Sequence, residues 1–134
     1  MKKFLILTLL AALLSTALIA QASSEDDFYD LVCVHNQTNV TINFRYRWGN
    51  GSWTTTQVQP GYMQSIWWEY DYPNEDWSPK LTIRFDSDLS SDTSYKSYSL
   101  EPLAAPTTNC RDYGRDYDFD YTDWGSIDLF DRSA

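Results

Sequence analysis

The chain is short and strongly acidic. It has 134 residues, with 10 lysines and arginines against 19 aspartates and glutamates, and a formal net charge of −9. Such a surface repels polyanions, so the charge balance excludes nucleic acid as the expected partner. A chain of this length builds a single hydrophobic core, which predicts one domain.

Residues 1–22 have the pattern of a secretory signal peptide. Two lysines precede an uncharged apolar run of the usual secretory length, and Ala20-Gln21-Ala22 then offers the small-x-small pattern that signal peptidase cleaves. We therefore expect bacterial export of a single domain, residues 23–134, to the periplasm or the exterior, with no membrane span. Loss of the two lysines makes the net charge more negative still.

Apolar and polar residues alternate with a period of two along the mature chain, and no helical period is evident. This pattern predicts strands, each with one apolar face. In chain order they are expected at residues 31–36, 41–48, 53–59, 62–70, 81–86, 94–100 and 116–121. Seven or eight short strands without a helix predict an all-β domain. We expect one antiparallel β-sandwich, with a small open β-barrel as the alternative.

Two short turns separate neighbouring strands. Asn50-Gly51 predicts a type I′ hairpin turn, because both central residues of that turn need positive φ. Such a hairpin would place Trp48 opposite Trp53 as a stabilising cross-strand pair. Pro60-Gly61 is typical of a type II turn.

The chain has two cysteines, Cys33 and Cys110. An even pair in an exported protein predicts a structural disulfide between them. Residues 101–109 contain two prolines and are expected to be an extended connection that returns Cys110 to the core. In the chain-entropy model, closing such a loop stabilises the fold by roughly 4.5 kcal/mol.

An aspartate comb on the strand at 116–121 begins like a calcium loop. Asp116, Asp118 and Asp120 match its opening, but Tyr121 stands where the loop needs glycine and Ile127 where it needs glutamate. Carboxylates on one face of a strand are about 6.8 Å apart, too far for three of them to hold one ion. We expect the comb to form cross-strand ion pairs instead. The arginines available for these pairs are Arg45, Arg47, Arg84 and Arg115.

Other residues suited to metal binding or catalysis are few. The loop carboxylates Asp86, Asp88 and Asp92 are a second set that could contribute to a metal site. The one histidine, His35, lies two residues after Cys33 on a strand and is expected to be structural. No nucleophile, zinc or phosphate-binding motif is present, so we expect no catalytic residue and no cofactor.

Aromatic residues between 67 and 77 are the candidate ligand-binding patch. Trp67 and Trp68 are adjacent on a strand, so they point to opposite faces and only one of them can enter the core. Rigid rings beside acidic and amide side chains suit stacking on a sugar or anchoring a protein contact. The candidate residues are Trp67, Trp68, Tyr70, Tyr72 and Trp77. The alternative is that loops fold over these rings as small satellite clusters.

The sequence therefore predicts an exported, non-catalytic acidic β-domain that binds a protein or a carbohydrate through this aromatic patch. One alternative is an acidic inhibitor or partner of a cationic protein, whose binding would weaken steeply with salt. Another alternative is a structural domain stabilised by a metal ion. The pattern of residues does not specify the ligand or the oligomeric state.

Overall fold

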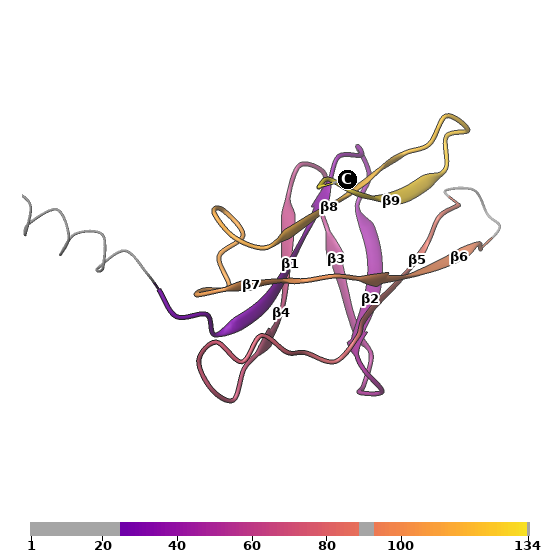
Figure 1. The fold of residues 1–134 in the computed structure, drawn as a ribbon. Coiled ribbons are helices and arrows are strands. Elements are labelled where there is room, and N and C mark those ends of the chain that lie inside the picture. Colours follow the sequence, from indigo (N-terminus) through magenta and orange to yellow (C-terminus); the bar gives the residue numbers. More distant parts are fainter. Residues whose placement is uncertain (1–24, 89–92, 134) are drawn as a thin grey trace, which may run out of the picture.

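Strands alone make up the secondary structure of residues 25–88 and 93–133, the part of the chain that the computed structural model describes (Figure 1). In chain order they are β1 (Tyr29–Asn36), β2 (Ile42–Trp48), β3 (Thr54–Val58), β4 (Met63–Glu69), β5 (Leu81–Asp86), β6 (Tyr95–Leu100), β7 (Leu103–Ala105), β8 (Arg115–Tyr121) and β9 (Ile127–Asp131). The signal peptide predicted at residues 1–22 lies outside the described residues. No helix in the described part is long and apolar enough to cross a membrane.

Two sheets pack face to face, which confirms the predicted β-sandwich. The first sheet has the order β4-β1-β8-β9, and β7 also pairs with β1. β1 is its central strand, antiparallel to β4 and β7 and parallel to β8. The second sheet has the order β3-β2-β5-β6 and is antiparallel throughout. β7 lies within the segment expected to be an extended connection, and β9 was not expected.

Alternate residues of both sheets fill the space between them. In the middle of the core, the ring of Phe119 from the first sheet meets Phe44 and Phe85 from the second, with centroid distances of 5.6 and 5.0 Å. The clearest alternating patterns in the sequence thus supply the centre of the core. Its buried members are Val32, Val34, Ile42, Phe44, Val58, Ile66, Leu81, Ile83, Phe85, Leu100, Tyr117, Phe119 and Ile127.

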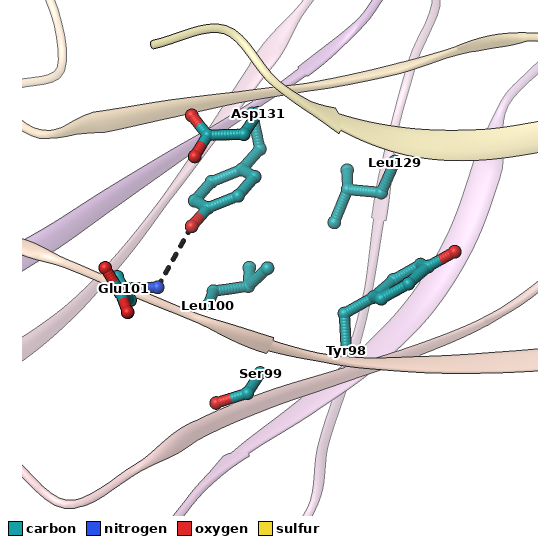
Figure 2. A pocket seen from close by; sticks show the side chains of 7 residues that line it. Tyr98, Ser99, Leu100, Glu101, Leu129 and Asp131 are labelled. Carbon is teal, nitrogen blue, oxygen red and sulfur yellow. Dashed lines mark hydrogen bonds between the residues drawn. The ribbon is translucent and has the colours of Figure 1, made fainter. Parts of the chain in front are cut away.

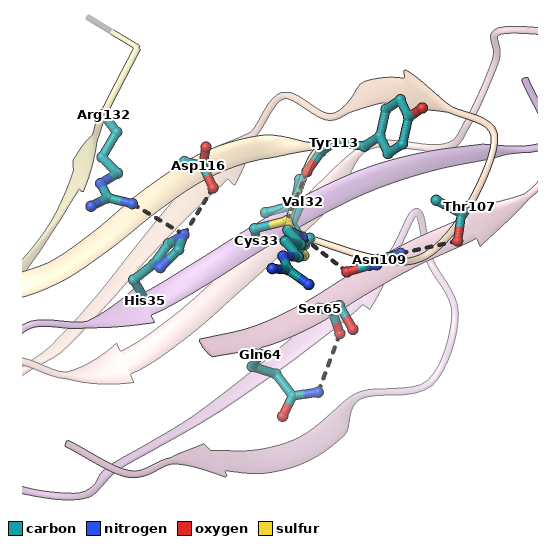
Figure 3. Close-up of a disulfide and its surroundings, with 12 residues drawn as sticks. Val32, Cys33, His35, Gln64, Ser65, Thr107, Asn109, Tyr113, Asp116 and Arg132 are labelled. Carbon is teal, nitrogen blue, oxygen red and sulfur yellow. Dashed lines mark hydrogen bonds and ion pairs between the residues drawn. A yellow bond between two sulfur atoms is a disulfide. The ribbon is translucent and has the colours of Figure 1, made fainter. Parts of the chain in front are cut away.

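The predicted disulfide lies on the opposite face of the first sheet. Leu31 and Cys33 point away from the main core, yet both are fully buried and form a second small cluster. Cys33 is bonded to Cys110, with 5.8 Å between the Cα atoms, and this bond ties the loop between β7 and β8 to β1 (Figure 3). The loop returns to β8 through Gly114, whose φ is +95°.

The turn between β2 and β3 differs from the predicted type I′ turn. Positive φ occurs at Gly49, at +56°, and not at Asn50 or Gly51. The N–H of Gly51 donates to the carbonyl of Trp48 at 3.0 Å, which defines a type II′ turn with glycine at its first central position. The pairing of β2 with β5 determines where the turn begins. The N–H of Gly49 donates to the carbonyl of Lys80, next to β5, so β2 stays paired up to the turn.

The predicted pair of Trp48 and Trp53 across this turn is wrong. The pairing of Tyr46 with Thr54 places the two tryptophans on opposite faces of the second sheet. Trp48 points inward and contacts Trp68 of the first sheet, with ring centroids 5.8 Å apart. The next turn agrees with its type II prediction, because Gly61 has a φ of +76° at the required position.

Replacing Gly114 with alanine should destabilise the protein more than replacing Gly125. Both glycines have positive φ, which costs an alanine about 1–2 kcal/mol. At Gly114 the new Cβ would also lie 2.6 Å from the Sγ of Cys33, whereas nothing lies within 4 Å at Gly125. Overpacking of this kind costs roughly a further 1–3 kcal/mol. Denaturant unfolding of Gly114→Ala and Gly125→Ala measures the difference, and equal losses would contradict the close packing over the disulfide.

Candidate functional site

The five aromatic residues predicted to bind a ligand do not form one surface. Trp67 lies on the outer face of the first sheet and is 46% exposed, whereas Trp68 points inward and is half-buried. Tyr72 and Trp77 lie in the loop after β4 and are 74% and 61% exposed. Tyr70 is buried. Three of the five rings are therefore open to a partner, and two belong to the interior.

Tyr70 satisfies a buried carboxylate at one end of the sandwich. Its hydroxyl donates a short hydrogen bond to Asp30 of β1, which is 5% exposed, and lies 3.4 Å from Oδ1 of Asp76. Burial raises the pKa of Tyr70 well above its ordinary value, and the neighbouring carboxylates add to the effect. The hydroxyl proton is thus held inside the fold rather than offered to a ligand.

The aspartates of β8 pair with basic side chains on the outer face of the first sheet. Asp116 Oδ1 lies 2.8 Å from Nε2 of His35, and Asp118 Oδ2 lies 3.0 Å from Nε of Arg132. Nη1 of Arg132 also lies 3.3 Å from the same nitrogen of His35, so the four side chains form one network, of which Figure 3 shows Arg132, His35 and Asp116. Of the three aspartates, Asp118 therefore forms an ion pair with an arginine, but with Arg132 rather than with a predicted partner.

The arginines expected to pair with the comb lie elsewhere. Arg115 instead binds Asp131 of β9 at 2.6 Å, and this hydrogen bond holds the pKa of Asp131 below its ordinary value. Arg45, Arg47 and Arg84 lie on the second sheet, across the core from β8. The expectation that these three pair with the comb is wrong, because an alternating pattern identifies a strand but not the sheet to which it belongs.

Two of the carboxylates considered for a metal site, Asp86 and Asp120, accept hydrogen bonds from backbone N–H groups. Asp86 Oδ1 accepts from the N–H groups of Asp88 and Ser94, both at 3.0 Å. Oδ1 of Asp120 accepts from the N–H of Tyr121. Asp92 lies outside the described residues. Within the described ranges, no group of three or more histidine, cysteine, aspartate or glutamate side chains is arranged to hold a metal ion.

Three arginines gather on the outer face of the second sheet. Arg45 and Arg47 alternate with the inward residues of β2, and Arg84 of β5 is the direct cross-strand partner of Arg45. Two rings flank them. The guanidinium of Arg47 lies 4.6 Å from the centre of the Trp53 ring, and that of Arg84 lies 4.5 Å from the Tyr95 ring. We call these five residues the arginine–aromatic face.

The guanidinium groups of this face have no ionic partner in the described part of the chain. The four ion pairs found there all join other residues. Nε of Arg47 is buried without any hydrogen-bond partner. Arg45 and Arg84 lie directly opposite each other on neighbouring strands. Like charges in that position destabilise a sheet. Within the described residues, the cationic cluster therefore has no ion pair, although the chain has 19 acidic residues.

A hollow of about 390 Å³ lies at this face. That volume is within the range of about 300–1,000 Å³ that small-molecule sites occupy. The lining combines two cations with neutral polar groups and one acid. Its members are Asn43, Phe44, Arg45, Thr55, Arg84, Phe85, Asp86 and Tyr95.

A second hollow of about 390 Å³ lies between the edges of the two sheets, beside β6 and β9 (Figure 2). Tyr98 and Leu129 point toward it. The hydroxyl of Tyr98 donates to Asp128 at 2.7 Å, and Lys96 pairs with the same carboxylate at 3.1 Å. Burial and this hydrogen bond raise the pKa of Tyr98 to about 12. The polar side chains here bond to each other across the two sheets. Fewer hydrogen-bonding groups are therefore free to bind a ligand in this hollow.

Comparisons of the chain with models of known protein families, with curated proteins and with solved structures found no match. The site is therefore judged on its own geometry. Sequence reasoning identified Arg45, Arg47 and Arg84 as polar-face residues but assigned them to acidic partners. The Arg-x-Arg spacing on β2 could have indicated a cationic cluster instead, because it places two like charges on one face of the strand.

Truncation of Trp68 should destabilise the protein far more than truncation of its neighbour Trp67. Trp68 packs between the sheets against Trp48, so Trp68→Ala should lower the free energy of unfolding by about 2 kcal/mol or more. Trp67→Ala removes a ring that is about half exposed and lies outside the main core, and should change the free energy of unfolding by about 1 kcal/mol or less. Urea unfolding of both variants tests the assignment, and a larger loss for Trp67→Ala would reverse it.

Tyr70 should contribute to a loss of stability at alkaline pH. Because its pKa is raised in the folded state, the stabilisation is fully present below the unfolded value of about 10 and declines as the pH rises beyond it. Tyr70→Phe should flatten this alkaline decline. It should also cost about 1–3 kcal/mol at neutral pH, because Asp30 loses its donor. Unfolding measured across the alkaline range checks both effects, and an unchanged slope would exclude the role of Tyr70.

Proposed function

We propose that the chain is an exported, non-catalytic binding module that captures an anionic ligand on its arginine–aromatic face. The observation that carries the proposal is a group of three guanidiniums, side by side on a protein whose formal net charge is −9, that have no ionic partner among residues 25–88 and 93–133. In that part of the chain the cluster brings no ion-pair stabilisation to the fold. The cluster is suited to binding an anionic ligand from solution.

The geometry prepares these arginines for an anion. A guanidinium beside a ring keeps its in-plane N–H donors available, and those donors match the two oxygens of a carboxylate or the oxygens of a phosphate or sulfate. Arg45 lies within cation–π distance of both rings, 5.6 Å from Trp53 and 6.0 Å from Tyr95. The rings therefore limit the movement of long side chains that would otherwise lose more entropy on binding.

This proposal retains a binding module with aromatic contacts but changes the location of the site. Trp53 and Tyr95, rather than the rings between residues 67 and 77, are now the aromatic residues of the proposed binding site. The Cys33–Cys110 disulfide supports export, because such bonds persist in oxidising compartments. The acidic side chains Asp116 and Asp118 already pair with basic groups, so they lend less support to an inhibitor of cationic proteins.

Removing two arginines from the face should abolish anion binding without unfolding the protein. The mature, oxidised protein, with labelled nitrogen, would be titrated with glucuronate, acetate, sulfate and phosphate. We expect the Nε–H resonances of Arg45 and Arg84 to shift in the wild-type protein and the response to be lost in Arg45→Gln/Arg84→Gln. The free energy of unfolding should change by about 1 kcal/mol or less, because lost ring contacts are offset by lost repulsion.

Arg111→Gln is the control for loss of a positive charge elsewhere on the surface. Arg111 lies exposed in the loop that contains the disulfide and also carries no ion pair among the described residues. This variant loses one positive charge and should bind as the wild type does. If anions shift the resonances of Arg111 as much as those of Arg45, or none of these anions binds, the proposed function is wrong.

A further inference from the structure

We propose that the ligand of the arginine–aromatic face is a compact carboxylated sugar, a single acidic unit at the end of a neutral glycan or free in solution. Its carboxylate would lie between Arg45 and Arg84, and its ring would lie against Tyr95. This inference rests on the proposed function and narrows it to one ligand class.

The charge around the face selects against a long polyanion. Electrostatic interactions act over about 10 Å at ordinary ionic strength, so the distant charges of an extended anion would lie beyond the reach of the three arginines. The hollow itself includes a carboxylate, Asp86. A ligand with one negative charge gains from Arg45 and Arg84, whereas a further charge in the hollow is repelled by Asp86.

The neutral lining of the hollow suits hydroxyl groups. Asn43 and Thr55 provide side-chain donors and acceptors beside the arginines. Oδ1 of Asp86 accepts from two backbone N–H groups, and its other oxygen can accept from a sugar hydroxyl. An inorganic dianion leaves these polar groups unused and is repelled by the carboxylate. A sugar acid uses both the cations and the acceptors.

Tyr95 supplies the apolar surface that a sugar ring needs. Arg84 lies over the ring at 4.5 Å, yet the residue remains 56% exposed and lines the hollow. The C–H face of a pyranose can pack on such a ring while its carboxylate reaches the adjacent guanidiniums. The cationic and apolar contacts are therefore next to each other, as one small amphipathic ligand requires.

Calorimetry with matched probes tests this inference. Sodium glucuronate should bind wild-type protein at least about tenfold more tightly than acetate, which lacks the sugar, or glucose, which lacks the charge. Tyr95→Ala should weaken glucuronate binding by about tenfold and acetate binding by clearly less, because acetate loses only the ring that orders the arginines, whereas the sugar also loses its packing surface. An oligosaccharide of neutral sugars with one terminal glucuronate should bind at least as well as free glucuronate. Tighter binding of free glucuronate would identify the free sugar acid, rather than the end of a glycan, as the ligand.

Asp86→Asn separates a sugar acid from an inorganic dianion. Asparagine keeps the Oδ1 acceptor, so the hydrogen bonds from the N–H groups of Asp88 and Ser94 should persist. The variant should bind sulfate more tightly than the wild type, because a repelling charge is removed, while its glucuronate affinity stays equal or falls. Stronger glucuronate binding in this variant would count against the role of Asp86 as a hydroxyl acceptor.

The outcomes distinguish the two proposals. Equal binding of acetate, sulfate and glucuronate through Arg45 and Arg84 would overturn the sugar inference and leave the anion-binding function standing. Tighter binding of polygalacturonate per carboxylate than of glucuronate would also overturn it, in favour of a polyanion. Failure of every probe to bind would reject both proposals.

Discussion

The burial of β1 on both of its faces is the constraint on which the rest of the fold depends. Val32 and Val34 point into the space between the sheets, while Leu31 and Cys33 point outward, and all four are fully buried. A continuous apolar run is typical of strands covered on both sides. The outer side of β1 is covered by the disulfide loop, which is why this small domain has a second cluster besides its main core.

The two outer faces of the sandwich differ in how their charges are compensated. On the first sheet, Asp116 contacts His35 and Asp118 forms an ion pair with Arg132, so the acidic strand has a structural explanation. On the second sheet, three arginines face solvent together without carboxylate partners among the described residues. The contrast matters more than the net charge, because a ligand meets one face of a protein and screening hides much of the remainder.

The aromatic residues show what a local pattern can and cannot determine. Adjacency required Trp67 and Trp68 to point to opposite faces, and they do. The pattern did not show that Tyr70 would bind the buried Asp30, because that contact joins strands that are distant in the sequence. Likewise, the β2–β3 turn lies one residue earlier than predicted, which places Trp53 on the arginine–aromatic face. The pairing of β2 with β5 determines the position of that turn.

From its sequence alone, the chain determined an all-β domain, the alternating strands of its core and the single disulfide, because periodicity and cysteine count are local or compositional properties. It also determined which residues of β2, β5 and β8 face outward. Only the tertiary structure decided which strands share a sheet, and hence which charges meet. Strand order therefore separated Arg45, Arg47 and Arg84 from the aspartates of β8 and left them beside Trp53 and Tyr95, where the candidate site lies.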